Sequence, residues 1–194
     1  MMARSLLFAG LASCVAMPAA AQNQAVNPHF LNDLSGWIVF NKPLYNGTYD
    51  PSQGFNTPGA LRINTTAATV LNFVVVRQCL PVVPTQVVDF GGKYRFESGH
   101  AANLKGFASV LWFTNTTCTA PAGLPLVSTN TVNDIPDTWL PVHANDVVVP
   151  ATANSAFFQL AIQPSAGEAR GWFDDVYFGP DPLTPVELQD FRVE

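Results

Sequence analysis

The stretch Gly171-Trp172-Phe173-Asp174-Asp175-Val176-Tyr177-Phe178 decides the fold class of this chain. Aromatic and β-branched residues dominate it without the 3.6-residue spacing of an amphipathic helix, which is typical of a strand. Similar runs precede it at 36–40, 60–63, 70–76, 93–98, 108–113 and 156–162, with two further candidates at 139–144 and 147–149. Eight or nine short strands with Gly-, Pro- and Asn-rich turns, among them Asn46-Gly47 and Gly91-Gly92, predict an all-β antiparallel β-sandwich.

The alternation of apolar and polar residues within these runs predicts which strand faces are exposed to solvent. In the 93–98 run, Tyr94 and Phe96 share one face while Arg95 and Glu97 share the other, which we expect to face solvent. The 108–113 run carries apolar side chains on both faces, so it is either a central strand or has one face covered by a loop. The longest polar, turn-rich stretch, 41–59, is predicted to be a structured loop of the kind that tends to be functional.

The first 21 residues have the pattern of a secretory signal peptide. Arg4 precedes an apolar run that closes on Ala19-Ala20-Ala21, a small-residue cleavage site. The prediction is a domain at 22–180, a Pro-rich tail at 181–194, and an exported, periplasmic or extracellular protein without a transmembrane segment. Leu11-Ala12-Ser13-Cys14 also resembles a lipobox, which leaves open a lipid anchor at Cys14 as the minority interpretation.

Export also bears on cysteine chemistry and on partners. Two cysteines, Cys79 and Cys118, remain after residue 21, and an even number in an exported chain predicts one disulfide. Closing that loop would stabilise the fold by roughly 4 kcal/mol. Removing residues 1–21 takes away one of nine basic residues and none of the fourteen acidic ones, so the formal net charge changes from −5 to −6. This charge argues against a nucleic-acid partner, which needs a basic surface.

Both ends of the predicted domain resemble the galactose-binding-like jelly rolls of bacterial carbohydrate-binding modules. The segment Asn27-Pro28-His29-Phe30-Leu31 with Gly36-Trp37 is similar to the family's opening, and the stretch from Trp172 to Phe178 is similar to its final strand. Gly92 to Ser98 falls between them in the family's usual order. The resemblance covers about residues 26–180 and implies a jelly roll.

The resemblance also bears on metal binding. In relatives, an acidic residue of the opening segment and an aspartate of the final strand commonly hold a structural calcium ion, and calcium favours six to eight oxygen ligands. Leu31 stands where the family has the acidic residue. The ligands that remain for such a Ca²⁺ ion are Asp174 and Asp175, helped by Asn27; no other cofactor is expected.

Catalytic motifs are missing from the sequence. Asp174 and Asp175 are adjacent on a predicted strand, so their carboxylates point to opposite faces and do not form an acid/base pair. The three histidines are far apart, and there is no G-x-S-x-G or phosphate-binding loop. The prediction is therefore a protein that is not an enzyme.

Glycan recognition needs exposed aromatic faces and planar polar side chains. The candidate ligand-binding residues are Tyr45, Tyr49, Trp112, Asp50, Arg95 and Glu97, whereas Trp37, Trp139 and Trp172 are expected in the core. The leading hypothesis is a secreted, non-catalytic module that binds a glycan. The alternatives are a structural or adhesion protein of the bacterial envelope that binds protein partners and, less favoured, a polysaccharide lyase or hydrolase.

Overall fold

The structure is a computed structural model that describes residues 22–66, 72–100, 104–123, 126–131, 135–164 and 167–180. The predicted signal peptide with Cys14, and the tail at 181–194, lie outside the described residues. No helix in the described part of the chain is long and apolar enough to cross a membrane.

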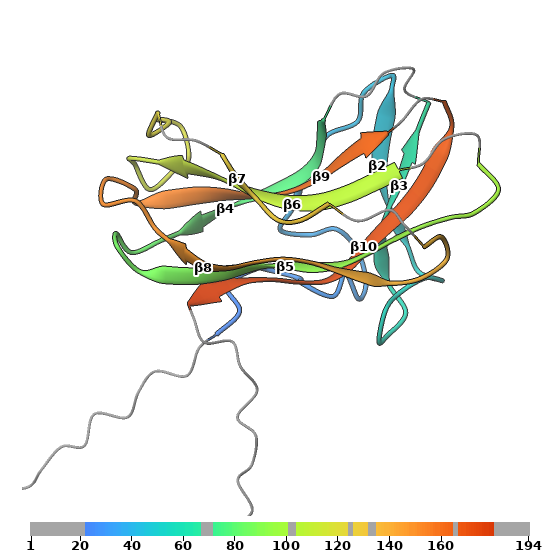
Figure 1. The fold of residues 1–194 in the computed structure, drawn as a ribbon, viewed down its shortest axis with the longest axis horizontal. Coiled ribbons are helices and arrows are strands. Elements are labelled where there is room, and N and C mark those ends of the chain that lie inside the picture. Colours follow the sequence, from blue (N-terminus) through green and yellow to red (C-terminus); the bar gives the residue numbers. More distant parts are fainter. Residues whose placement is uncertain are drawn as a thin grey trace, which may run out of the picture.

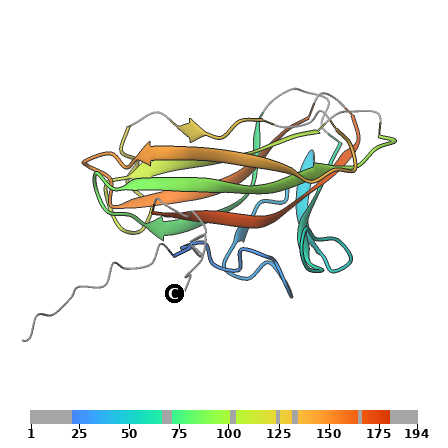
Figure 2. The same ribbon diagram turned by 60° about the horizontal axis from the view of Figure 1, so that its bottom comes forward.

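Ten strands form two five-stranded antiparallel sheets that pack face to face (Figures 1 and 2). One sheet has the order β1-β4-β9-β6-β7 and the other β2-β3-β10-β5-β8, so strands distant in sequence lie side by side, as in a jelly roll. The predicted all-β sandwich is confirmed. The strands are β1 Ile38–Val39, β2 Tyr45–Asp50, β3 Ala60–Thr65, β4 Phe73–Pro81, β5 Val87–Phe96, β6 Leu104–Phe113, β7 Val127–Ser128, β8 Leu140–Val148, β9 Ser155–Pro164 and β10 Ala169–Pro180.

The stretch that decides the fold class forms β10, the middle strand of its sheet. Phe173 lies opposite Leu61 of β3 and Tyr94 of β5, and all three side chains are buried in the core. Trp172 and its cross-strand neighbour Arg95 occupy the other face. The alternation predicted for 93–98 is thus confirmed: Tyr94 and Phe96 are buried, while Arg95 and Glu97 are partly exposed.

Two predictions about turns are wrong. Asn46-Gly47, expected in a loop, lies inside β2, where the backbone of Gly47 approaches the core so closely that a Cβ atom would stand 2.9 Å from Val75 Cγ1. Gly91-Gly92, expected to be a turn, lies inside β5, where a Cβ on Gly91 would stand 2.1 Å from the Val142 carbonyl oxygen. In both strands glycine marks close packing and not a reversal of the chain.

The strand at 108–113 is covered on both faces, as its composition predicts. Ala108, Val110 and Trp112 of β6 belong to the core between the sheets. On the opposite face, Phe113 packs with Phe157 of β9 and Cys118 in a second, smaller cluster. The turn that follows β6 therefore covers an apolar patch on the outside of the sandwich.

A buried tyrosine joins the two sheets. Tyr94 of β5 donates a hydrogen bond of 2.6 Å to the carbonyl oxygen of Leu104 at the start of β6. The cross-strand partner of Leu104 is Pro164, which has no N–H to offer, so the phenol supplies the missing donor. Gly106 leaves room for the ring, since a Cβ there would lie 2.3 Å from Tyr94 Cγ.

Candidate functional site

Three of the six predicted ligand-binding residues come together on the outer face of the β2-β3-β10-β5-β8 sheet. Asp50, Arg95 and Glu97 all point away from the core there, around the indole of Trp172. Asp50 accepts a hydrogen bond of 3.0 Å from Trp172 Nε1, and the guanidinium of Arg95 lies 4.9 Å from the centroid of the Trp172 ring. Trp172 is 3% exposed, so its ring offers no free face to a ligand.

These polar groups are largely occupied by partners within the chain. Arg95 donates to Gln53 Oε1 at 2.9 Å and lies 3.5 Å from Asp137, while Arg170 pairs with Glu97 at 3.0 Å. Asn64 Oδ1 accepts hydrogen bonds from both Arg62 and Arg170. We call this network the arginine clamp: Arg62, Arg95, Glu97 and Arg170 with Asn64 and Trp172. The clamp holds the 51–59 segment against the sheet.

Two carboxyl groups at the edge of the clamp have shifted pKa values. Partial burial raises the pKa of Asp50, but hydrogen bonds from Ser52 and Trp172 outweigh it and the net pKa is lowered. Hydrogen bonds from Ser98 lower the pKa of Asp137. Both carboxylates therefore act as acceptors that fix neighbouring loops.

The three aromatic candidates do not converge. Trp112 is 2% exposed and sits in the core, which corrects the expectation that its ring faces a ligand: it lies on the inward-facing side of β6 with Ala108 and Val110. Tyr45 stacks on Phe73 with ring centroids 4.7 Å apart, and Tyr49 donates a hydrogen bond to the Leu31 carbonyl oxygen. Both tyrosines point from β2 to the side opposite Asp50, so they do not share its surface.

A small depression lies beside Tyr45. It has a volume of about 70 Å³ and is lined by Lys42–Asn46 and Asn64–Thr66. Small-molecule sites usually enclose about 300 to 1,000 Å³, so this depression is too small to hold a sugar chain by itself.

Trp139 corrects a second expectation. It was predicted to be a core residue, but it is partly exposed immediately before β8, with its ring edge-on to Phe55 at 6.3 Å. Lys93 Nζ lies 4.8 Å from the Phe55 ring centroid. The two rings extend the surface beside the clamp.

The three residues predicted to bind calcium are engaged in hydrogen bonds. The two carboxylate oxygens of Asp174 accept the backbone N–H groups of Phe55 and Asp175, at 2.6 and 2.7 Å. The Asn27 amide donates to the Asp33 carbonyl oxygen at 2.8 Å. Among the described residues, no group of three His, Cys, Asp or Glu side chains is placed to hold a metal ion. The side-chain groups predicted to hold a calcium ion are thus engaged within the chain, whereas calcium takes six to eight oxygen ligands.

A different set of side chains meets on the outer face of the other sheet. The guanidinium carbon of Arg77, in β4, lies 3.8 Å from the ring centroid of Phe157 in β9 and 4.9 Å from that of Phe40. Phe157 in turn meets Phe113 edge-on at 4.8 Å. The result is a row in which a planar cation lies against two aromatic rings, an arrangement that is attractive electrostatically.

Neutral polar groups continue this row across the sheet. Gln159 of β9 is the cross-strand neighbour of both Arg77 and Ser109, and the Ser109 hydroxyl donates to Gln159 Oε1 at 3.3 Å. Leu111 lies two residues further along β6 and is partly exposed. We call this surface the Arg77 face; its members are Phe40, Arg77, Lys105, Ser109, Leu111, Phe157 and Gln159.

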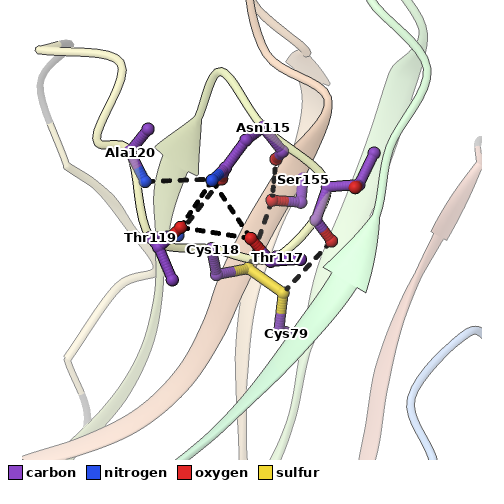
Figure 3. The surroundings of a disulfide bond; sticks show 8 residues. Cys79, Asn115, Thr117, Cys118, Thr119, Ala120 and Ser155 are labelled. Carbon is purple, nitrogen blue, oxygen red and sulfur yellow. Dashed lines mark hydrogen bonds between the residues drawn. A yellow bond between two sulfur atoms is a disulfide. The ribbon is translucent and has the colours of Figure 1, made fainter.

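Figure 3 shows the disulfide beside the turn that contains Asn115 and Thr117. Cys79, two residues beyond Arg77 on β4, is bonded to Cys118 with a Cα–Cα distance of 5.9 Å, which confirms the predicted pairing. Asn115 organises the turn, since its Oδ1 accepts the N–H groups of Thr119 and Ala120. Ser155 Oγ of β9 donates to the Asn115 carbonyl oxygen at 2.6 Å. The bridge thus ties the turn after β6 to the strand that carries Arg77.

Most of the Arg77 face was not found in the sequence. Arg77 sits in a run of valines, and Phe157 and Gln159 sit in a run with apolar residues on both faces. The available signal was the alternation in β9, where Ala156, Phe158 and Leu160 fill the core and so direct Phe157 and Gln159 outward. Which of the two apolar faces is the inner one depends on strand order, and the sequence does not specify that order.

Comparison with known proteins supports the fold. No protein-family model and no curated protein matches the chain. Among solved structures, the family 61 carbohydrate-binding module TmCBM61, in complex with β-1,4-galactotriose, aligns with a TM-score of 0.57 and 18% identity over 82% of this chain and 99% of that one. The C-terminal family 22 carbohydrate-binding module of Clostridium thermocellum Xyn10B aligns with a TM-score of 0.59 and 10% identity, over 81% and 93% of the two chains.

An enzyme also contains this fold. The enzymatically active domain of tailspike protein 4 from bacteriophage CBA120 aligns with a TM-score of 0.59 and 14% identity over 81% of this chain, which spans only 21% of the tailspike chain. At these identities the likeness shows the fold and nothing further. The chain has the β-sandwich jelly-roll fold of carbohydrate-binding modules, as the motifs at its two ends predict.

Proposed function

We propose that the protein is a non-catalytic carbohydrate-binding module and that it binds glycan across the Arg77 face. The observation that carries the proposal is the guanidinium of Arg77, which lies against the rings of Phe40 and Phe157 and has no hydrogen-bond partner among the described residues. Planar donors bind the hydroxyl oxygens of sugars, and exposed aromatic rings pack against their C–H faces. Phe40 is partly exposed, whereas Phe157, Gln159 and Ser109 are 8%, 6% and 1% exposed, so these three position Arg77 and do not themselves face a ligand.

The alternative surface, the arginine clamp, is less suited to this role. Each of its arginines already has an acceptor within the chain, and the Trp172 ring is covered by Arg95. A ligand there would have to break hydrogen bonds that hold the 51–59 segment. Contacts of Asp50, Arg95 and Glu97 with a ligand remain a prediction, secondary to the Arg77 face.

Binding to insoluble and soluble polysaccharides tests the proposal. The purified protein should be retained by at least one polysaccharide in pull-down and affinity electrophoresis, and Arg77→Ala and Phe157→Ala should each weaken that retention about tenfold or more. Lys42→Ala serves as the matched control, because it removes a positive charge from an exposed position before β2. Failure to bind any polysaccharide, or loss of binding in Lys42→Ala alone, would contradict the proposal.

We also infer that the protein acts outside the cytoplasm. The Cys79–Cys118 disulfide supports this, since such bonds persist in oxidising compartments. Mass spectrometry of the mature N-terminus in the native host tests the inference. Cleavage after Ala21 would support a soluble exported protein, an acylated Cys14 would support an anchored one, and an uncleaved chain would contradict export.

A further inference from the structure

Charge is distributed unevenly between the two sheets. The strands of the β1-β4-β9-β6-β7 sheet contain two cationic residues, Arg77 and Lys105, and neither aspartate nor glutamate. The strands of the opposite sheet carry five acidic residues, Asp50, Asp89, Asp146, Asp174 and Asp175, and four cationic ones, Arg62, Lys93, Arg95 and Arg170. Since the whole chain has a formal net charge of −5, the Arg77 face is a cationic surface on an acidic protein.

Arg77 differs from the other described arginines. Arg62, Arg95 and Arg170 each donate to an acceptor within the chain, whereas no side chain or backbone group among the described residues accepts a hydrogen bond from Arg77. Its Nε atom is buried without a partner, as is that of Arg95, but Arg95 has acceptors for its terminal nitrogens and Arg77 has none among the described residues. A partly buried cation without an acceptor is in an unfavourable position, which an anionic ligand would relieve.

The rings beside Arg77 fix its orientation. The ring centroid of Phe157 lies 3.8 Å from the guanidinium carbon and that of Phe40 lies 4.9 Å from it, so two aromatic rings hold the group in place. A guanidinium edge matches the two oxygens of a carboxylate in a bidentate pair. Stacking also lowers the entropy lost when the side chain engages a ligand.

Gln159 lies beside Arg77 and supports the face from within. As the cross-strand neighbour of Arg77, it has its Cα about 5 Å from that of Arg77. Its Oε1 accepts the hydroxyl of Ser109, and the two residues are 6% and 1% exposed. Arg77 is therefore the donor that a ligand meets here, and the ligand group that suits it is an acceptor.

Lys105 places a second cation at the other end of the face. Its neighbours Leu104 and Gly106 face the core, so Lys105 points outward on β6. On β9, the cross-strand partner of Lys105 is Gln163 and that of Arg77 is Gln159, and these two partners are four residues apart. β4 and β6 lie on either side of β9, so they are two strand spacings apart. A rise of ~3.3 Å per residue and a strand spacing of ~4.8 Å put the two backbones roughly 16 Å apart. A ligand that reaches both is extended and carries more than one acid group.

We propose that the Arg77 face binds acidic polysaccharides, with a uronate carboxylate paired to Arg77. The inference rests on the proposed function, because it assigns the ligand class of the same face. Arg77 supplies the bidentate pair, and Lys105 attracts the next acid group along the chain.

The test compares one polysaccharide in two charge states. Affinity electrophoresis is run in alginate and polygalacturonate and in the same polymers after carboxyl reduction, with dextran and dextran sulfate as a further pair. Wild-type protein should bind the carboxylated polymers about tenfold more tightly than the reduced ones. Rising salt should weaken that binding through screening.

Variants assign the effect to residues. Arg77→Gln should abolish the preference for the carboxylated polymer. Arg77→Lys should retain only part of this preference, because an ammonium group cannot form the bidentate pair of a guanidinium. Lys105→Gln should reduce the preference about two- to fivefold. Lys42→Ala, with the same loss of charge elsewhere, should leave it unchanged. Circular dichroism confirms that each variant is folded, and the comparison of native with reduced polymer needs no variant.

The outcomes separate the two proposals. Equal binding to carboxylated and carboxyl-reduced polymers overturns the acidic-ligand inference and leaves carbohydrate binding in place. Tighter binding to dextran sulfate than to either uronate polymer overturns the assignment of a carboxylate. Binding to no polysaccharide of any charge overturns the proposed function and with it the inference.

Discussion

His29 Nδ1 lies 2.7 Å from Asp175 Oδ1, and this contact ties the segment that opens the domain to the strand that closes it. Asn56 Nδ2 donates to the other oxygen of Asp175 at 3.3 Å. The neighbouring carboxylate, Asp174, accepts a hydrogen bond from the backbone N–H of Phe55. Side-chain and backbone hydrogen bonds thus join the opening segment, the 51–59 segment and β10, where the resemblance to other jelly rolls implies a calcium ion.

We expect the stability of the protein to be independent of calcium. A calcium ion would have to compete with the His29 and backbone N–H groups that Asp174 and Asp175 already bind. Thermal unfolding in excess EDTA and in millimolar CaCl₂ should give the same midpoint, with MgCl₂ as the control for ionic strength. A midpoint that rises with calcium and not with magnesium would contradict this prediction.

The disulfide should account for a large part of the stability. Cys79→Ala combined with Cys118→Ala opens a loop whose ends are 39 residues apart, and should lower the free energy of unfolding by roughly 3 to 4 kcal/mol. Denaturant unfolding measures the loss. Wild-type protein unfolded in the presence of a reducing agent is the internal control and should match the double variant. A double variant as stable as the oxidised protein would show that the turn around Asn115 holds without the bridge.

The fold could be predicted because its signals are local. Alternation, short β-branched runs and the motif around Asp174 each depend on a few neighbouring residues, and all of them pointed to a sandwich. β2 was missed because it is an edge strand whose glycine, Gly47, resembles a turn signal. Its true role, close approach to Val75, appears only once the sheets are packed.

The candidate site was harder to predict because it depends on strand order. Trp112 and Phe157 are both aromatic residues in strands with two apolar faces, yet one is buried in the core and the other lies under Arg77 on the outside. The outward direction of Arg95 could be predicted, but its hydrogen bond to Gln53 and its ion pair with Asp137 could not. A side chain's free hydrogen-bonding capacity follows from contacts that are distant in sequence.

The link between Tyr94 and Leu104 should be worth a measurable part of the stability. Tyr94→Phe leaves the Leu104 carbonyl without a donor, because Pro164 opposite cannot supply one, and should cost about 1 to 2 kcal/mol. Chemical denaturation of the two proteins measures the difference. An unchanged free energy of unfolding would mean that water takes the place of the phenol.

Gly106 should tolerate no side chain while Tyr94 is in place. Gly106→Ala puts a methyl group against the Tyr94 ring and should destabilise the protein by about 1 to 3 kcal/mol. A double-mutant cycle with Tyr94→Leu is the control, since the smaller side chain should reduce the cost of the added methyl group. Strictly additive effects would argue that the two residues do not meet.

Asp50 should make the stability depend on pH on the acidic side. Its net pKa is lowered in the folded protein, because hydrogen bonds from Ser52 and Trp172 outweigh the effect of partial burial. A carboxyl group with a lowered folded pKa contributes stability that is present above its unfolded pKa, near 3.8, and is lost as the pH falls through the folded pKa. Asp50→Asn should therefore be less stable than wild type at pH 6, by about 1 kcal/mol, and the difference should shrink toward pH 2.

Urea unfolding at intervals between pH 2 and pH 6 measures both proteins, and Asp146→Asn, at an exposed position of β8, controls for the loss of one acidic charge. A constant difference across the whole range would show that the ionised state of Asp50 does not matter to the clamp.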